Sequence, residues 1–138
     1  MEIKIDNLEE VPKAARALLD MIQPKGVYAF DGAMGNGKTT LIVELLKQLG
    51  IVDPEGSPTY SLVNSYQTER LGAVFHFDFY RITEEDEAYD IGVEEMFFGG
   101  GTCLIEWPER IKNLLPDGTI WINLRKNEDE TRTLTVDL

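Results

Sequence analysis

One glycine-rich stretch of this sequence is suited to holding phosphate groups: residues 32–40 read GAMGNGKTT. The stretch fits the pattern G-x-x-x-x-G-K-[ST], in which glycines allow a tight turn whose backbone N–H groups approach phosphate oxygens. The start of a following helix adds to the same anion site. In this pattern Lys38 neutralises charge on the β and γ phosphates, and the Thr39 hydroxyl is a ligand for Mg²⁺. The stretch therefore predicts a site for a nucleoside triphosphate and Mg²⁺.

The rest of the stretch is expected to surround the same ligand. The predicted cofactors are ATP and Mg²⁺, with GTP as the alternative, because the pattern recognises phosphates and not the base. Lys38 is the predicted catalytic lysine as well as a phosphate ligand. The residues of this stretch predicted to bind the cofactor are Met34, Gly35, Asn36, Gly37, Lys38, Thr39 and Thr40.

Two acidic side chains that follow predicted buried strands are candidates to hold the metal ion or its water. Glu106 comes after the apolar run 103–105, and Asp78 comes after the run 74–77. A phosphate-binding loop needs a carboxylate at the end of a neighbouring strand. Both residues stay candidates, against the alternative that each is an ordinary surface acid in a chain that has 25 acidic residues.

Three other side chains could also take part in chemistry or line a site, but we interpret each of them as structural. His76, the only histidine, is more typical of a satisfied structural residue than of a general base. Cys103, the only cysteine, lies in an apolar run and is interpreted as an inert buried thiol. Trp107 could pack over the site, but a tryptophan taken by itself is more typical of a core or an interface.

The elements that must position these residues alternate between strands and helices early in the chain and form hairpins later. An apolar run at 27–30 predicts a buried strand before the glycine-rich turn, and apolar residues spaced over 41–49 predict a helix after it. The other expected strands are 1–5, 61–67, 73–79, 102–105, 120–124 and 133–136, and the other expected helices are 8–22 and 108–115, with exposed helix and loop over 84–95. This order predicts an α/β fold, a single P-loop domain over 1–138 whose mixed parallel and antiparallel sheet is flanked by helices.

Composition limits the possible functions. The chain has 138 residues, of which 43% are hydrophobic, and this fits one globular domain. The net charge of −12 argues against a nucleic-acid binder acting alone and favours solubility or a basic protein partner. A single cysteine excludes an intramolecular disulfide, and no Cys/His zinc pattern is present. Without a leader pattern or an apolar run of about 18 residues, we expect a cytoplasmic protein with no membrane partner.

Four segments together resemble the TsaE (YjeE) family, bacterial ATPases of tRNA threonylcarbamoyladenosine synthesis. In order they are GNGKTT at 35–40, SPTYSLV at 57–63, HFDFYR at 76–81 and EWPE at 106–109. Many families share the first segment, whereas the other three make the resemblance specific. Their order and spacing cover about residues 27–110.

The resemblance implies a role for each matching residue. Lys38 would bind phosphate, and Thr39 and Glu106 would hold Mg²⁺. Asp78 would bind on the γ-phosphate side as a catalytic or water-positioning group. Ser57 and Thr59 would belong to a switch-like loop that senses the nucleotide.

Outside these segments the resemblance is weaker. Arg132 lies where the family often places a nucleotide-contacting arginine, although Thr131 replaces the glycine that commonly precedes it. Asn36 stands where alanine is common. Residues 7–10 are candidates to line the adenine.

As a function, the resemblance implies an accessory protein that binds and hydrolyses ATP for N6-threonylcarbamoyladenosine formation at position 37 of ANN-decoding tRNAs. Its implied partners are the TsaD and TsaB proteins, with tRNA reached only through their complex. It would be a weak Mg²⁺-dependent ATPase that its partners activate. The alternatives are a small-molecule kinase, a nucleotide-dependent switch such as a GTPase, and a non-catalytic nucleotide-binding module. The sequence contains neither an arginine-rich lid nor the Asn-Lys-x-Asp segment of guanine-binding proteins.

Overall fold

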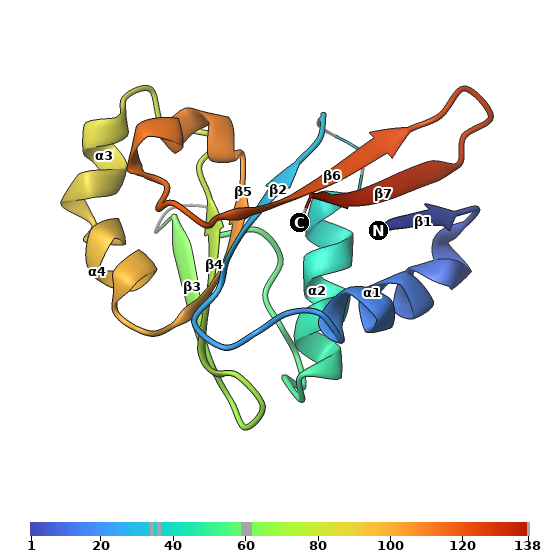
Figure 1. The fold of residues 1–138 in the computed structure, drawn as a ribbon, viewed down its shortest axis with the longest axis horizontal. Coiled ribbons are helices and arrows are strands. Elements are labelled where there is room, and N and C mark those ends of the chain that lie inside the picture. The colour runs from blue at the N-terminus through green and yellow to red at the C-terminus, as the bar shows by residue number, and fades with distance from the viewer. Residues whose placement is uncertain (34, 36, 59–61, 138) are drawn as a thin grey trace.

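The computed structural model describes residues 1–33, 35, 37–58 and 62–137. Within them, seven strands form one sheet in the order β1-β7-β6-β2-β5-β4-β3 (Figure 1). The strands are β1 (Glu2–Ile5), β2 (Val27–Asp31), β3 (Val63–Thr68), β4 (Gly72–Asp78), β5 (Thr102–Glu106), β6 (Ile120–Lys126) and β7 (Arg132–Asp137).

The sheet is parallel in its centre and antiparallel at both edges. Strand β2 pairs in parallel with β5 and β6, and β5 pairs in parallel with β4. The antiparallel pairs are β3 with β4, β6 with β7, and β1 with β7. The predicted mixed sheet and both predicted hairpins are therefore confirmed. The carboxyl ends of β2, β5 and β4 lie together at one edge of the sheet, where α/β proteins place their ligands.

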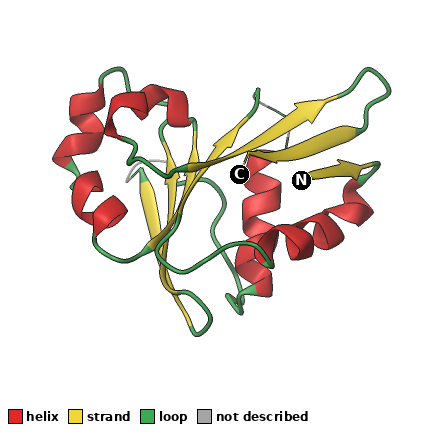
Figure 2. Ribbon diagram, in the orientation of Figure 1, coloured by secondary structure: helices red, strands yellow, loops and turns green. Residues whose placement is uncertain are grey.

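Helices cover both faces of the sheet (Figure 2). The α-helices are α1 (Val11–Leu19), α2 (Lys38–Gln48), α3 (Glu85–Asp90) and α4 (Val93–Phe98), and 3₁₀ turns occur at η1 (Leu8–Glu10) and η2 (Pro108–Leu114). One core contains α1 and α2, and the other contains side chains of α3, α4 and η2. None of the helices in the described part of the chain is long and apolar enough to cross a membrane.

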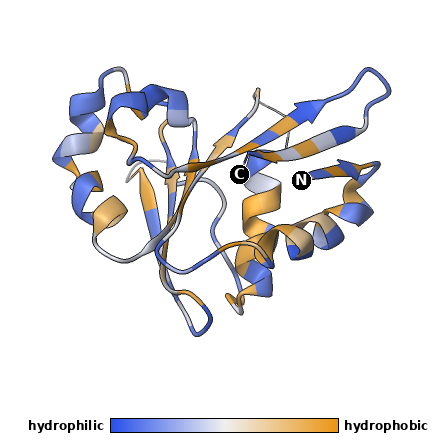
Figure 3. Cartoon of the chain, viewed as in Figure 1, coloured by the Kyte–Doolittle hydropathy of each residue, from blue (hydrophilic) through white to orange (hydrophobic). Residues whose placement is uncertain are grey.

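Successive side chains of a central strand point to opposite faces of the sheet, so such a strand can contribute to both cores. In β2, Tyr28 and Phe30 belong to the core with α1 and α2, and Val27 belongs to the core with α3 and α4. Every residue of β2 from 27 to 30 is buried, as expected for a parallel strand covered on both sides. The tip of the β6–β7 hairpin extends beyond these layers and is hydrophilic (Figure 3).

Three segments differ in detail from the sequence-based expectation. The helix expected over 8–22 begins as η1, capped by Asn7, whose side chain accepts a hydrogen bond from the Glu9 N–H at 2.9 Å. Proline lacks an N–H group and is tolerated only in a first turn, so Pro12 requires α1 to begin at Val11. In place of the helix expected over 108–115 the structure has a 3₁₀ segment, η2, with non-helical backbone at Ile111.

The acidic segment 84–95 contains two short helices. Gly92, with φ of 86°, separates α3 from α4. Although the segment is acidic, Ala88 and Val93 are fully buried and help α3 and α4 cover the sheet. The segment is therefore a structural layer of the fold, with its charges on the outer side.

Candidate phosphate and metal site

The predicted phosphate-binding turn lies between β2 and α2, at the carboxyl end of a central parallel strand. Gly37, directly before α2, has φ of 94°, which glycine adopts without strain. Gly32 lies so close to β6 that a Cβ there would be 2.6 Å from the Leu124 carbonyl oxygen. Because Gly37 has no side chain to cap α2, the first N–H groups of the helix are available to an anion. Met34 and Asn36 lie outside the described residues.

The Lys38 ammonium is buried beside this turn and has no hydrogen-bond acceptor among the described residues. Lys38 is 5% exposed, and its Nζ lies 3.8 Å from the centre of the Trp107 ring. Desolvation by burial lowers the Lys38 pKa below its ordinary value, and four nearby carboxylates, Glu106 foremost, oppose that shift. Since an unpaired buried cation is costly, its position is best explained by an anionic ligand that completes the site.

A buried carboxylate faces the first turn of α2. Glu106, the last residue of β5, is 2% exposed. Its Oε1 accepts a hydrogen bond from Thr39 Oγ1 at 2.7 Å, and its Oε2 lies 2.7 Å from His76 Nε2. The structure thus brings the two predicted metal ligands, Thr39 and Glu106, together. Because the Thr39 hydroxyl donates its proton to Glu106, its lone pairs are left for a cation.

The second candidate carboxylate, Asp78, ends β4 directly opposite Glu106 in the parallel register. Its Oδ2 accepts a hydrogen bond from Ser57 Oγ, and its Oδ1 accepts one from the Tyr80 N–H at 2.9 Å. The segment predicted to act as a switch is therefore linked to Asp78 through Ser57. Thr59, the other residue of that prediction, lies outside the described residues.

The predicted catalytic residues line one cavity of about 330 Å³. Its lining residues are Gly35, Gly37, Lys38, Thr39, Thr40, Asp78, Tyr80, Glu106 and Trp107. Tyr80 has no predicted role there, whereas Trp107 packs over the site, which is the alternative that the sequence left open; the two ring centres are 4.9 Å apart. Trp107 also packs against the core with α3 and α4, which agrees with its structural interpretation. Its position directly after a buried carboxylate is the sequence signal for its place at the site.

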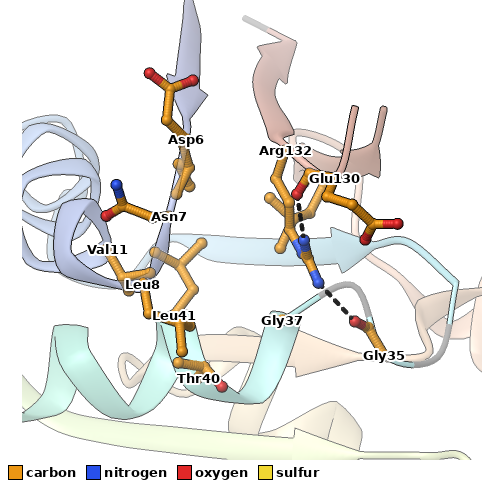
Figure 4. A pocket seen from close by; sticks show the side chains of 12 residues that line it. Asp6, Asn7, Leu8, Val11, Gly35, Gly37, Thr40, Leu41, Glu130 and Arg132 are labelled. Carbon is orange, nitrogen blue, oxygen red and sulfur yellow. Dashed lines mark hydrogen bonds between the residues drawn. The ribbon is translucent and has the colours of Figure 1, made fainter. Parts of the chain in front are cut away.

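A second cavity of similar size borders the same turn (Figure 4). Asn7, Leu8 and Val11 form one wall, and Arg132 comes from β7 on the opposite wall. Of the residues 7–10 predicted to line the adenine, Asn7 and Leu8 line this cavity. The Arg132 guanidinium donates hydrogen bonds to the Gly35 carbonyl at 3.2 Å and to the Glu130 carbonyl at 3.3 Å. The two cavities share the lining residues Gly35, Gly37 and Thr40, so they adjoin at the turn, and we refer to the two together as the cleft.

The donor groups of this cleft fit a Mg²⁺–triphosphate ligand better than an ion held by protein alone. Among the described residues, no group of three His, Cys, Asp or Glu side chains could hold a metal. The Thr39 hydroxyl and the Glu106 carboxylate are hard oxygen groups, which suit Mg²⁺ when phosphates and water supply its other ligands. The Lys38 ammonium and the α2 N-terminus suit the phosphates.

On the same strand as Glu106, the thiol of Cys103 is predicted to be unreactive. Cys103 is fully buried in β5, and burial raises its pKa to about 12. At pH 8 the thiolate fraction is then about one in 10⁴, and the thiolate is the reactive form. We expect no alkylation of the native protein in an hour at pH 8, but one modified thiol per chain in denaturant, measured by mass spectrometry. Rapid native alkylation would contradict the burial of Cys103.

A family model described as "Threonylcarbamoyl adenosine biosynthesis protein TsaE" matches residues 5–134 of this chain. Among curated proteins, the tRNA threonylcarbamoyladenosine biosynthesis protein TsaE of Bacillus subtilis is 34% identical over 129 residues, which are 94% of this chain and 80% of that protein. The protein of the same name from Treponema pallidum is 37% identical over 116 residues, 84% of each chain.

A solved structure has the same fold. The crystal structure of YdiB from Bacillus subtilis superposes with a TM-score of 0.79 and 26% sequence identity, covering 99% of this chain and 83% of that one. The superposition therefore includes the sheet and both helical layers that position the cleft.

Proposed function

Since this chain belongs to the TsaE family and functions in tRNA threonylcarbamoyladenosine biosynthesis, we propose that its part there is to bind and hydrolyse ATP with Mg²⁺. The observation that carries the proposal is the buried Lys38 ammonium, which has no acceptor among the described residues and lies at the start of α2. A triphosphate would supply the missing acceptors and the negative charge that this position favours.

Each residue of the first cavity would have a separate role in binding or hydrolysis. Lys38 and the N–H groups of α2 would bind the β and γ phosphates, and Thr39 Oγ1 would be a ligand of Mg²⁺. Glu106 would keep the Thr39 hydroxyl oriented and accept hydrogen bonds from water on the ion. Asp78, at the adjacent strand end, would orient the attacking water once its contact with Ser57 is released. Bound Mg²⁺ would itself offset the charge of the phosphates.

The second cavity would hold the base and ribose. Leu8, Val11 and Leu41 offer apolar contacts to a base, and Arg132 connects this wall to the phosphate-binding turn through Gly35. ATP is the proposed nucleotide and GTP the competitor to be tested. A base bound at this wall would bring the N-terminal segment and β7 together around the nucleotide.

The proposed partners are the TsaD and TsaB proteins, which would raise a weak intrinsic ATPase rate. With a net charge of −12, the chain is better suited to a basic protein surface than to direct contact with tRNA phosphates. The proposed interaction with tRNA is therefore indirect and occurs through the complex.

Reconstitution tests this function. In the presence of TsaB, TsaD, tRNA and the other substrates of the modification, we expect this protein with Mg·ATP to permit many modified tRNAs per complex, measured by nucleoside mass spectrometry. Calorimetry should show binding of Mg·ATP, with Mg·GTP weaker. No gain in modified tRNA over the reaction without this protein would contradict the accessory role. No heat with either nucleotide would contradict the site itself.

A further inference from the structure

The only histidine of the chain contacts Glu106 but is not among the residues that line the first cavity. His76 is in the middle of β4, is fully buried, and lies on the same face of the sheet as Val74, toward α2. In the parallel register His76 pairs with Leu104, so its side chain lies two residues before Glu106 on that face. Its Nε2 is 2.7 Å from Glu106 Oε2.

The hydrogen bonding of His76 is one-sided. Because Glu106 is an acceptor when ionised, the network assigns the proton of a neutral imidazole to Nε2. Nδ1 is buried and has no hydrogen-bond partner within the described part of the chain. A buried histidine with a purely structural role would be expected to form hydrogen bonds through both ring nitrogens, since buried polar atoms are rarely left unpaired. The polar contact of His76 is thus directed at Glu106 alone.

The Glu106 carboxylate depends on this contact for its orientation. One oxygen is occupied by the Thr39 hydroxyl and the other by His76, at 2.7 Å each. The two contacts come from different elements, α2 and β4, and together they determine the plane of the carboxylate. With the contact from β4 removed, the carboxylate keeps one hydrogen bond and can rotate about its last torsion, which has only weak preferences.

We propose that His76 is a positioning residue for metal binding: its Nε2–H holds Glu106 so that the Thr39 hydroxyl donates to the carboxylate and turns its lone pairs toward Mg²⁺. This inference rests on the proposed function, since it assigns His76 to the same metal site. His76 touches neither nucleotide nor metal in this arrangement. Partners of metal ligands commonly change metal affinity about 10–100-fold when they are removed.

Three variants separate positioning from packing. His76→Leu keeps an apolar side chain in the core but has no donor. His76→Gln can place an amide N–H near the position of Nε2 and should restore the donor. Val74→Ala is the matched control, because Val74 is fully buried on the same face of β4 and removing its methyl groups affects packing only.

The measurement is ATP binding by calorimetry, in EDTA and across a Mg²⁺ titration, together with the thermal midpoint of each variant. For His76→Leu we expect the half-saturating Mg²⁺ concentration to rise about 10–100-fold, with ATP affinity in EDTA within about twofold of wild type. His76→Gln should recover most of the Mg²⁺ response. Val74→Ala should lower the thermal midpoint without changing that response.

Each outcome bears on the inference. An unchanged Mg²⁺ response in a folded His76→Leu protein overturns it, as does an equal loss in EDTA and in Mg²⁺. If His76→Leu does not fold, the folded glutamine variant decides by the same titration: a Mg²⁺ response close to wild type supports the role, and a response shifted about tenfold or more overturns it. If wild type itself binds ATP without any Mg²⁺ response, the proposed function fails first and the inference with it.

Discussion

Lys38→Ala is expected to reduce nucleotide-dependent turnover by at least about a hundredfold while leaving the fold intact. The substitution removes the one ammonium that the described structure places at the start of α2 within the cavity. Charge-assisted hydrogen bonds of this kind contribute roughly 1.5–3 kcal/mol each, and Lys38 would make more than one to the phosphates. Phosphate release assays with TsaB and TsaD, and calorimetry with Mg·ATP, measure the loss.

The charge of Lys38 makes the effect of the same substitution on stability depend on pH. Burial lowers the Lys38 pKa in the folded protein below its ordinary value of 10.5, so the folded state disfavours the charged form. Below both pKa values this penalty is fully present, and it disappears as pH rises to the unfolded value. Replacing Lys38 removes the penalty, so any gain in thermal midpoint should be largest near neutral pH and should shrink at alkaline pH.

Two further variants test whether the effect on turnover comes from the Lys38 ammonium group. Lys38→Met keeps most of the hydrocarbon chain over Trp107 and should be as inactive as the alanine variant. Lys47→Ala removes an exposed lysine from the last turn of the same helix and should leave turnover unchanged. Wild-type turnover in Lys38→Met, or an equal loss in Lys47→Ala, would be inconsistent with a phosphate contact from Lys38.

Glu106→Ala is expected to lower Mg²⁺-dependent turnover by about 10²–10³-fold, with a smaller effect on metal-free nucleotide binding. The carboxylate is buried and accepts the hydrogen bond of Thr39, so its loss frees the hydroxyl to turn away from the ion. Metal-free binding should be maintained or become tighter, because a negative charge near the triphosphate is removed. Turnover at saturating and limiting Mg²⁺, and ATP binding in EDTA, give the comparison.

Two variants refine this result. Glu106→Gln keeps an oxygen acceptor for Thr39 and should retain more activity than the alanine variant. Glu109→Gln removes a charge that also acts on Lys38, but Glu109 is exposed, so turnover should change less than about threefold. Equal losses in EDTA and Mg²⁺ for Glu106→Ala would argue against a role in holding the metal.

The order of elements and the fold class were predictable because local patterns decide them. The apolar run at 27–30 and the periodic residues over 41–49 became β2 and α2, with the glycine turn between them. Boundaries were less predictable where one residue overrides a pattern, as Pro12 does for α1. Because segment 84–95 is acidic, its sequence did not indicate that Ala88 and Val93 would be buried.

The arrangement of the candidate site was predictable only in part. Both Glu106 and Asp78 follow strands, and the sequence alone could not say which carboxylate contacts Thr39. The hydrogen bond between Thr39 and Glu106 joins residues 67 positions apart and depends on how α2 packs against β5. The contact of Arg132 with Gly35 spans 97 positions and depends on the β6–β7 hairpin.

The sequence by itself determined the glycine-rich turn that we propose to bind phosphate, since its glycines, lysine and threonines are contiguous and their chemistry follows from local backbone geometry. Only the tertiary structure decided that Lys38 is left without an acceptor among the described residues and that His76 contacts Glu106. Burial and strand register are properties of the whole packed sheet, and they bring together polar groups that no local pattern connects.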